Sequence, residues 1–149
     1  MTRVLIDCHL FYDGWFVEVL RELQRHKNIE FLYSKEEKYY SEIGANRKAL
    51  EFFKLMGLLG KLCIADESEV SHRRAELESQ AVWNSCGACD DPHIFAMVYV
   101  KPTKYIFSED KRIGTCRTTI NKSLSSRYCG FRVISSRALF DSHKHDIMI

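Results

Sequence analysis

The apolar residues of the chain follow two alternating patterns. Short apolar runs predict buried strands at residues 3–7, 29–33, 61–65, 104–110 and 131–135. Apolar residues spaced three or four positions apart predict helices at 14–26, 34–44, 47–59 and 93–100, and a charged helix is expected at 67–82. Strands that alternate with helices imply a mainly parallel sheet covered on both faces. The pattern therefore predicts a three-layer α/β/α sandwich.

Two local signals refine the expected helix at residues 34–44. Ser34 and Glu37 have the spacing of a capping box, which predicts that the helix starts at Ser34. Gly44 can end a helix in a left-handed turn. We therefore expect Ser34 outside the preceding strand and a positive φ at Gly44.

Length and composition fit one globular domain. The chain has 149 residues, is 46% hydrophobic and contains only two prolines, so a long linker is not expected. The expected core spans residues 3–135, and no element is assigned to the tail 136–149. No apolar run reaches the ~20 residues of a membrane span. Asp7 and Asp13 interrupt the N-terminal apolar residues, so no signal peptide and a cytoplasmic location are expected.

Charge is unevenly distributed. Residues 1–100 hold 12 Lys and Arg against 16 Asp and Glu, whereas residues 101–149 hold 10 against 4. A solvated surface with local bias explains this, and so does an acidic metal site beside a groove for a polyanion. Because neither a Gly-x-Gly-x-x-Gly pattern nor a P-loop is present, nucleotide cofactor binding is not supported.

Four acids occupy positions suited to a shared metal ion. Asp7 and Asp110 end predicted strands, Glu42 lies on the helix after the second strand, and Asp91 precedes the helix at 93–100. The carboxyl ends of parallel strands form the ligand-binding edge of such sheets. Clustered carboxylates repel one another unless a cation neutralises them, and Mg²⁺ or Mn²⁺ prefers these oxygen ligands. Such a cation can activate water for phosphodiester hydrolysis.

The same segments resemble the PIN-domain nuclease family over roughly residues 3–135. The matching pieces are "VLIDCHLF", "KYYSEIGANRKALEFFKLMGLLGKL", "CDDPHIFAMVYV" and "YIFSEDKRI", in this order. The resemblance implies a PIN-like α/β/α sandwich and a divalent-metal-dependent ribonuclease. Many small members are VapC-like toxins of toxin–antitoxin pairs, so an antitoxin partner and a homodimer are also implied.

Carried over residue by residue, the resemblance assigns the four acids to one site. Asp7, Glu42, Asp91 and Asp110 become the catalytic, metal-binding carboxylates, with Glu36 and Glu37 as nearby alternatives to Glu42. Ser108 falls where the family often has a Ser or Thr that helps to hold the metal's water shell. We expect Glu109 to point elsewhere, because side chains alternate along a strand. His93 is expected to orient or pack, since Mg²⁺ prefers oxygen.

An RNA path is suggested by the cations that follow the last acid. They are Lys111, Arg112, Arg117, Lys122 and Arg127. Three tyrosines, Tyr39, Tyr40 and Tyr128, could stack on bases if they are exposed, although half-buried positions are favoured. An alternative function also stays open, namely a non-catalytic PIN-like module that binds RNA or protein. The apolar stripes around Trp15, Phe16 and Leu20, or Phe52, Phe53 and Leu58, could bind an antitoxin helix or belong to the core.

Six cysteines are expected to be free thiols, because no export signal is recognised. Cys86-x-x-Cys89 has the spacing of half a zinc site, but a second pair is missing: Cys116 and Cys129 appear isolated in the sequence. A catalytic redox pair is disfavoured by the expected topology. A turn at Gly87 is favoured, and a Cys86–Cys89 disulfide under oxidising conditions stays open.

Overall fold

A computed structural model describes residues 1–149 and contains one five-stranded, all-parallel sheet. The strands are β1 (Thr2–Ile6), β2 (Ile29–Ser34), β3 (Leu62–Ala65), β4 (Tyr105–Phe107) and β5 (Arg132–Ile134). The helices are α1 (Gly14–Arg25), α2 (Glu37–Gly44), α3 (Arg47–Leu58), α4 (Glu67–Glu78), α5 (Ala81–Asn84), α6 (Pro92–Val100), α7 (Lys111–Ile120) and α8 (Arg137–Ile147). Two short 3-10 helices, η1 (Cys8–Tyr12) and η2 (Ser126–Tyr128), complete the chain. The predicted three-layer α/β/α sandwich is confirmed.

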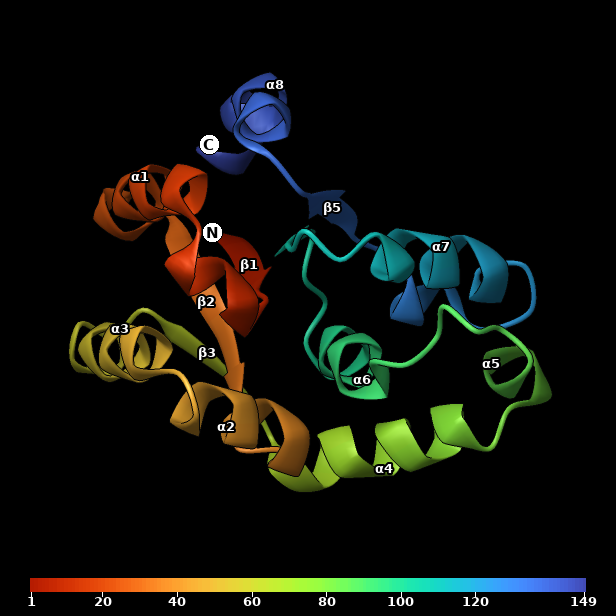
Figure 1. Ribbon diagram of the computed structural model, residues 1–149. Helices are drawn as coiled ribbons and strands as arrows, with labels where there is room; N and C mark the ends of the chain where they lie inside the picture. The colour runs from red at the N-terminus through yellow and green to blue at the C-terminus, as the bar shows by residue number, and fades with distance from the viewer.

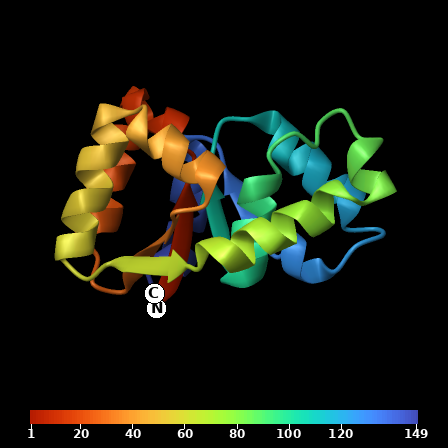
Figure 2. The same ribbon diagram turned by 90° about the horizontal axis from the view of Figure 1, so that it is seen from below.

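Helices cover both faces of the sheet (Figure 1). On the face with α1, α3 and α8, the ring of Phe107 in β4 packs against Phe16 of α1 and Phe140 of α8. Phe31 of β2 packs against Phe52 of α3 on this face. The other face carries α4, α6 and α7, and α4 lies across α6 (Figure 2). The two chain ends lie close together in the same view.

The strand order β3-β2-β1-β4-β5 creates a reversal point in the sheet. From β1 the chain proceeds through β2 to β3 on one side, whereas β4 and β5 lie on the other side. The carboxyl ends of β1 and β4 are therefore neighbours, and Ile6 pairs with Phe107 at this end. In open α/β sheets, ligands bind in the crevice at such a reversal point.

The start and end of α2 differ from the sequence prediction. Ser34 belongs to β2, and its hydroxyl donates a hydrogen bond to the Ala65 carbonyl at 2.9 Å. The side chain of Glu36 caps α2 by accepting from the backbone N–H groups of residues 38 and 39. The expected left-handed turn at Gly44 is wrong, because Gly60 is the only residue with a positive φ. The pairing of β2 with β3 holds Ser34 in the sheet, so Ser34 does not cap the helix as its local sequence predicted.

Two helices were not expected from the sequence, and two elements are shorter than predicted. Helix α7 contains Gly114 and several threonines, which are weak helix formers, but it buries Ile113, Cys116 and Ile120. Helix α8 forms from the unassigned tail and buries Phe140 and Ile147. The last predicted part of β4 leaves the sheet after Phe107, and the helix expected at 67–82 divides into α4 and α5. No helix combines the length and the apolar character that crossing a bilayer requires.

Candidate metal centre

The reversal point of the sheet positions Asp7 and Ser108. Asp7 follows β1 directly and caps η1, where its Oδ1 accepts a hydrogen bond from the backbone N–H of His9 at 3.3 Å. Its Oδ2 accepts from the buried Ser108 hydroxyl at 2.7 Å. Since Ser108 follows β4, this bond joins the carboxyl ends of two neighbouring strands that are distant in sequence.

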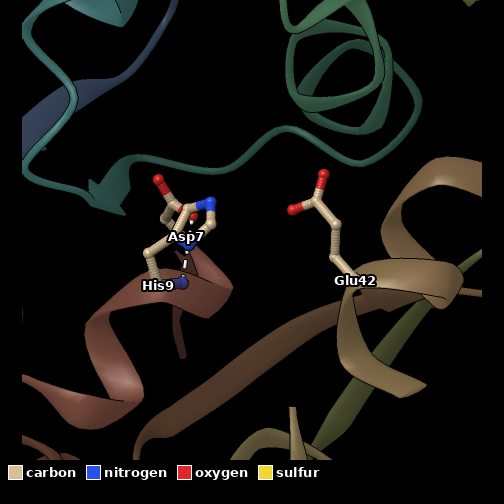
Figure 3. A group of neighbouring side chains, drawn as sticks. All are labelled: Asp7, His9 and Glu42. Atoms are coloured by element: carbon tan, nitrogen blue, oxygen red, sulfur yellow. Dashed lines mark hydrogen bonds between the residues drawn. The ribbon is translucent and has the colours of Figure 1, made fainter. Parts of the chain in front are cut away.

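A first group of possible ligands consists of Asp7, His9 and Glu42. One ligand atom from each of these residues lies within 4.8 Å of the others. Figure 3 shows Asp7 and His9 side by side at the start of η1, with the Glu42 carboxylate reaching toward them from α2. We call these three residues the β1 group.

Glu42 is held beside the buried His93. Its Oε1 lies 3.3 Å from His93 Nε2 and 3.9 Å from Lys38 Nζ. The Nε2 contact is close enough for an ion pair, although its geometry falls short of a hydrogen bond. Burial alone would raise the pKa of Glu42, but the interaction with His93, together with Lys38, outweighs burial and lowers this pKa. Glu42 is therefore an ionised carboxylate at neutral pH, with its charge partly balanced by neighbours.

A second group consists of Asp90, Asp91 and Asp110. Ligand atoms of these three residues also lie within 4.8 Å of one another. Asp91 is the N-cap residue of α6, and Asp110 is the N-cap residue of α7. Arg112 donates from Nε and Nη2 to the two carboxylate oxygens of Asp110 and also pairs with Asp90. We call Asp90, Asp91 and Asp110 the α7 group.

Within the α7 group, Asp91 and Asp110 have opposite electrostatic environments. The hydrogen bond from Arg112 lowers the pKa of Asp110. Burial raises the pKa of Asp91, and neighbouring carboxylates raise it further against the opposing effect of His93. The Asp91 carboxylate takes part in none of the structure's hydrogen bonds or ion pairs. Within the α7 group, Asp91 is thus the carboxylate that no cationic side chain pairs with.

The two groups are neighbours, linked through Ser108. The Ser108 hydroxyl that donates to Asp7 also accepts from the backbone N–H of Asp110 at 3.1 Å. The charge of Asp7 is among those that raise the pKa of Asp91. Carboxylate oxygens fit the preference of Mg²⁺ and Mn²⁺, and an unpaired, half-buried carboxylate fits a cation site. The donor set is therefore compatible with the predicted metals.

The structure brings Asp7, Glu42, Asp91, Asp110 and Ser108 to one edge of the sheet. Reasoning from the sequence missed three contributors, which are His9, Asp90 and Arg112 in its role as a counterion. The spacing Asp7-x-His9 at a strand end was a usable signal for the first. Glu109 points away as expected, because its carboxylate accepts a hydrogen bond from Trp15 Nε1 and faces Asp13.

The predicted RNA-binding cations have different surroundings. Arg112 is committed to the α7 group. Arg117 donates from Nε to the Cys129 carbonyl and lies over the ring of Phe131. Lys111 and Lys122 are exposed, and neither forms an ion pair. Arg127 donates to the Tyr99 carbonyl and lies over the Tyr99 ring.

Base stacking is excluded for two of the three candidate tyrosines. Tyr39 is fully buried, and its hydroxyl donates to the Ile6 carbonyl at the end of β1. Tyr128 is buried as well, with its ring centroid 4.5 Å from that of Tyr99. Only Tyr40 is half exposed. Tyr39 therefore supports the strand end that carries Asp7 and leaves no ring face for RNA.

The expectation of six free thiols is wrong for two cysteines. Cys89 and Cys116 form a disulfide, with Cα atoms 4.9 Å apart, so Cys86 is free and no Cys86–Cys89 bond exists. Cys116 looked isolated in the sequence because its partner is 27 positions away. The disulfide joins the residue before Asp90 to helix α7, which begins after Asp110. It therefore cross-links the two segments that supply the α7 group.

Comparison with models of known protein families gave no match, and neither the curated proteins nor the solved structures that were searched showed a significant similarity.

Proposed function

We propose that this protein is a divalent-metal-dependent endoribonuclease that hydrolyses phosphodiester bonds in RNA. One observation carries the proposal: the β1 group, with Asp7 and Glu42, and the α7 group, with Asp91 and Asp110, lie side by side where the strand order reverses. The resemblance of the sequence segments to PIN-domain nucleases supports the choice of reaction and substrate.

In this proposal the four carboxylates would hold Mg²⁺ or Mn²⁺. A bound divalent cation supplies Lewis-acid stabilisation of a phosphoryl group and lowers the pKa of water. Ser108 orients the Asp7 carboxylate and the backbone of Asp110 through its two hydrogen bonds. The exposed Lys111, at the first position of α7, would bind a substrate phosphate beside these acids.

Cleavage assays with matched variants test this function. Purified protein would be incubated with mixed single-stranded RNA and matched DNA, in Mn²⁺ or Mg²⁺ and in EDTA. We expect metal-dependent RNA cleavage that falls at least about a hundredfold in Asp7→Asn and Asp91→Asn, since losing even an outer-shell partner costs about 10–100-fold. Asp146→Asn is the control, because Asp146 is exposed and forms no ion pair.

A non-catalytic RNA- or protein-binding module is the alternative. If folded wild-type protein cleaves none of several RNAs in either metal, the endoribonuclease proposal fails. Retention of the biological activity by Asp7→Asn would favour the binding module.

A protein partner such as an antitoxin is a second proposal, supported by the surface between α1 and α3. A hollow of about 330 Å³ there is lined mainly by apolar side chains, including Leu20 and Leu55. Leu58 is 86% exposed nearby on α3. Phe52 and Phe53, also considered for this role, are buried and belong to the core. A small protein that co-purifies with the wild type but not with Leu55→Glu or Leu58→Glu would support this proposal. A homodimer that these same variants disrupt would instead indicate that the surface binds a second copy of the chain.

A cytoplasmic location stays a prediction. The Cys89–Cys116 disulfide weighs against it, because stable disulfides are rare in the cytosol. Thiol labelling of the protein in intact cells would show whether these two cysteines are oxidised where the protein acts.

A further inference from the structure

A groove leads away from the α7 group along helix α7. One hollow, of about 350 Å³, is lined by Asp110, Lys111, Thr115 and Ser135 among others. A second, of about 720 Å³, contains Lys104, Arg117 and Arg132. Both hollows are lined by Gly114, Thr118 and Val133, so they adjoin one another. The combined groove, here called the α7–β5 groove, is lined by residues of α7 and of the edge strand β5. Figure 1 shows where these two elements lie in the fold.

The charge of this groove is strongly one-sided. Its lining includes four cations, Lys104, Lys111, Arg117 and Arg132, and one acid, Asp110. Asp110 is already neutralised by Arg112. None of the four cations forms an ion pair, whereas Arg3, Arg74 and Arg137 elsewhere do. Uncompensated cations along a groove are the arrangement that binds the phosphates of a nucleic-acid strand.

We propose that the α7–β5 groove binds the sugar–phosphate backbone of single-stranded RNA and leads that strand to the acids at its Asp110 end. This inference rests on the proposed function and adds a path for the substrate. From Lys111 to Thr118 the helix advances roughly 10 Å at about 1.5 Å per residue. The path therefore covers phosphates next to the cleaved bond, on one side of it.

The groove has the chemistry for phosphate contacts and lacks a platform for bases. Its aromatic residues, Tyr105 and Phe131, are buried at 3% and 2% exposure. Hydroxyl groups of Thr115 and Thr118 line it, and both donate to backbone carbonyls of α7, which leaves their oxygen atoms able to accept. Contacts to phosphate carry no sequence information directly. The groove should therefore bind RNA with little sequence preference and with strong dependence on salt.

Gly114 offers a direct way to test the groove. It lines both hollows, and a Cβ added there would meet no atom within 4 Å. Its φ lies outside the left-handed region, so a side chain is compatible with the backbone. Gly114→Glu and Gly114→Gln place side chains of equal size at the centre of the groove, and only the first adds a negative charge.

The experiment measures binding separately from cleavage. Fluorescence anisotropy of a short labelled single-stranded RNA is recorded in EDTA, at several salt concentrations. We expect the Lys104→Gln/Arg132→Gln double variant to bind about ten- to thirtyfold more weakly at ~0.1 M salt, with the slope of log K against log salt reduced by about 1.4 for two lost phosphate contacts. Gly114→Glu should bind at least about fivefold more weakly than Gly114→Gln, because it sets a carboxylate among four cations.

The control is the Arg21→Gln/Lys54→Gln double variant. It makes the same change in net charge at exposed residues of α1 and α3 that form no ion pairs, and it should bind like the wild type. If both double variants bound RNA more weakly to the same extent, the groove proposal would be overturned, because RNA affinity would then depend only on the net charge of the protein. Competition by polyglutamate as strong as that by RNA of equal charge would also overturn it, in favour of an acidic protein partner.

Failures of the two proposals give different results. If the wild type cleaves RNA in a metal-dependent way but the groove variants bind RNA as well as the wild type does, the proposal for the α7–β5 groove is refuted and the proposed endoribonuclease function stands. If RNA binding depends on the groove residues but the wild type does not cleave RNA, the groove proposal stands and the proposed endoribonuclease function is refuted. Absence of both binding and cleavage removes both proposals.

Discussion

The β1 group and the α7 group are held in place by different means. Asp7, in the first, follows a central strand and accepts a hydrogen bond from Ser108, and the carbonyl of the preceding Ile6 accepts a buried hydrogen bond from Tyr39. The α7 group lies on segments outside the sheet, joined by the Cys89–Cys116 disulfide and by Arg112. The difference teaches that Asp7 is positioned by the sheet, whereas the α7 group is positioned by a cross-link and a counterion. The α7 group should therefore be the more sensitive half to redox state, salt and metal.

The largest effect is expected on reduction of the disulfide. Restricting a loop that spans 27 positions should stabilise the fold by roughly 3–4 kcal/mol on the loop-entropy model, so reductant should lower the free energy of unfolding by about this amount. Urea unfolding with and without a dithiol measures this. Cys86→Ser should keep the full response to reductant, because Cys86 is free. A response that disappears in Cys86→Ser would show that Cys86 is in the disulfide.

The β1 group should respond to loss of the Tyr39 hydroxyl instead. Tyr39→Phe removes the buried donor to the Ile6 carbonyl, one residue before Asp7. We expect the free energy of unfolding to fall by about 1–2 kcal/mol, since a buried acceptor is left without a partner. Urea unfolding of this variant is compared with Tyr40→Phe, whose half-exposed side chain should matter by less than about 0.5 kcal/mol. Equal effects at both positions would remove Tyr39 from its supporting role.

Arg112→Gln tests whether the α7 group binds metal. Arg112 is a cation next to Asp90 and Asp110, so its removal should strengthen Mn²⁺ binding by roughly fivefold, since solvent screens these charges only in part. Isothermal titration of metal-free protein measures the affinity, with Arg21→Gln as a control of equal net charge. Unchanged or weaker binding would mean that Arg112 and its acids form a structural ion pair and that Mn²⁺ does not use Asp110.

The smallest effects concern the stability of the metal-free protein and its dependence on pH. The raised pKa of Asp91 penalises the folded state above the ordinary Asp pKa, and the penalty disappears as pH falls. The lowered pKa of Asp110 stabilises the folded state above that value and is lost at lower pH. At pH 7, Asp91→Asn should therefore raise the free energy of unfolding and Asp110→Asn should lower it, each by about 1 kcal/mol or less. Urea unfolding from neutral to acidic pH in EDTA checks the signs, and two changes of the same sign would refute this assignment.

Much of the fold could be predicted because burial has a local signature. All five strands and the helices at 14–26, 47–59 and 93–100 followed from apolar spacing. Helix α7 could not be predicted in this way, since its threonines and Gly114 are weak helix formers and its stability comes from packing and the disulfide. At Ser34 a strong local capping signal predicted a helix start, but strand pairing places this residue in β2.

The sequence by itself determined where the five strands and the helices at 14–26, 47–59 and 93–100 form, and it placed Asp7 at a strand end and Asp91 before a helix, because the residues that decide these features are neighbours in the chain. It placed Asp110 at a strand end, whereas the structure makes Asp110 the N-cap residue of α7. Only the tertiary structure decided that β4 lies beside β1, that Cys89 bonds with Cys116, that Arg112 neutralises Asp110, and that Lys104 and Arg132 share a groove with Lys111. These pairs lie on different elements or far apart in sequence. Their proximity depends on how the whole sheet and its helices pack, and a local periodicity carries no record of that.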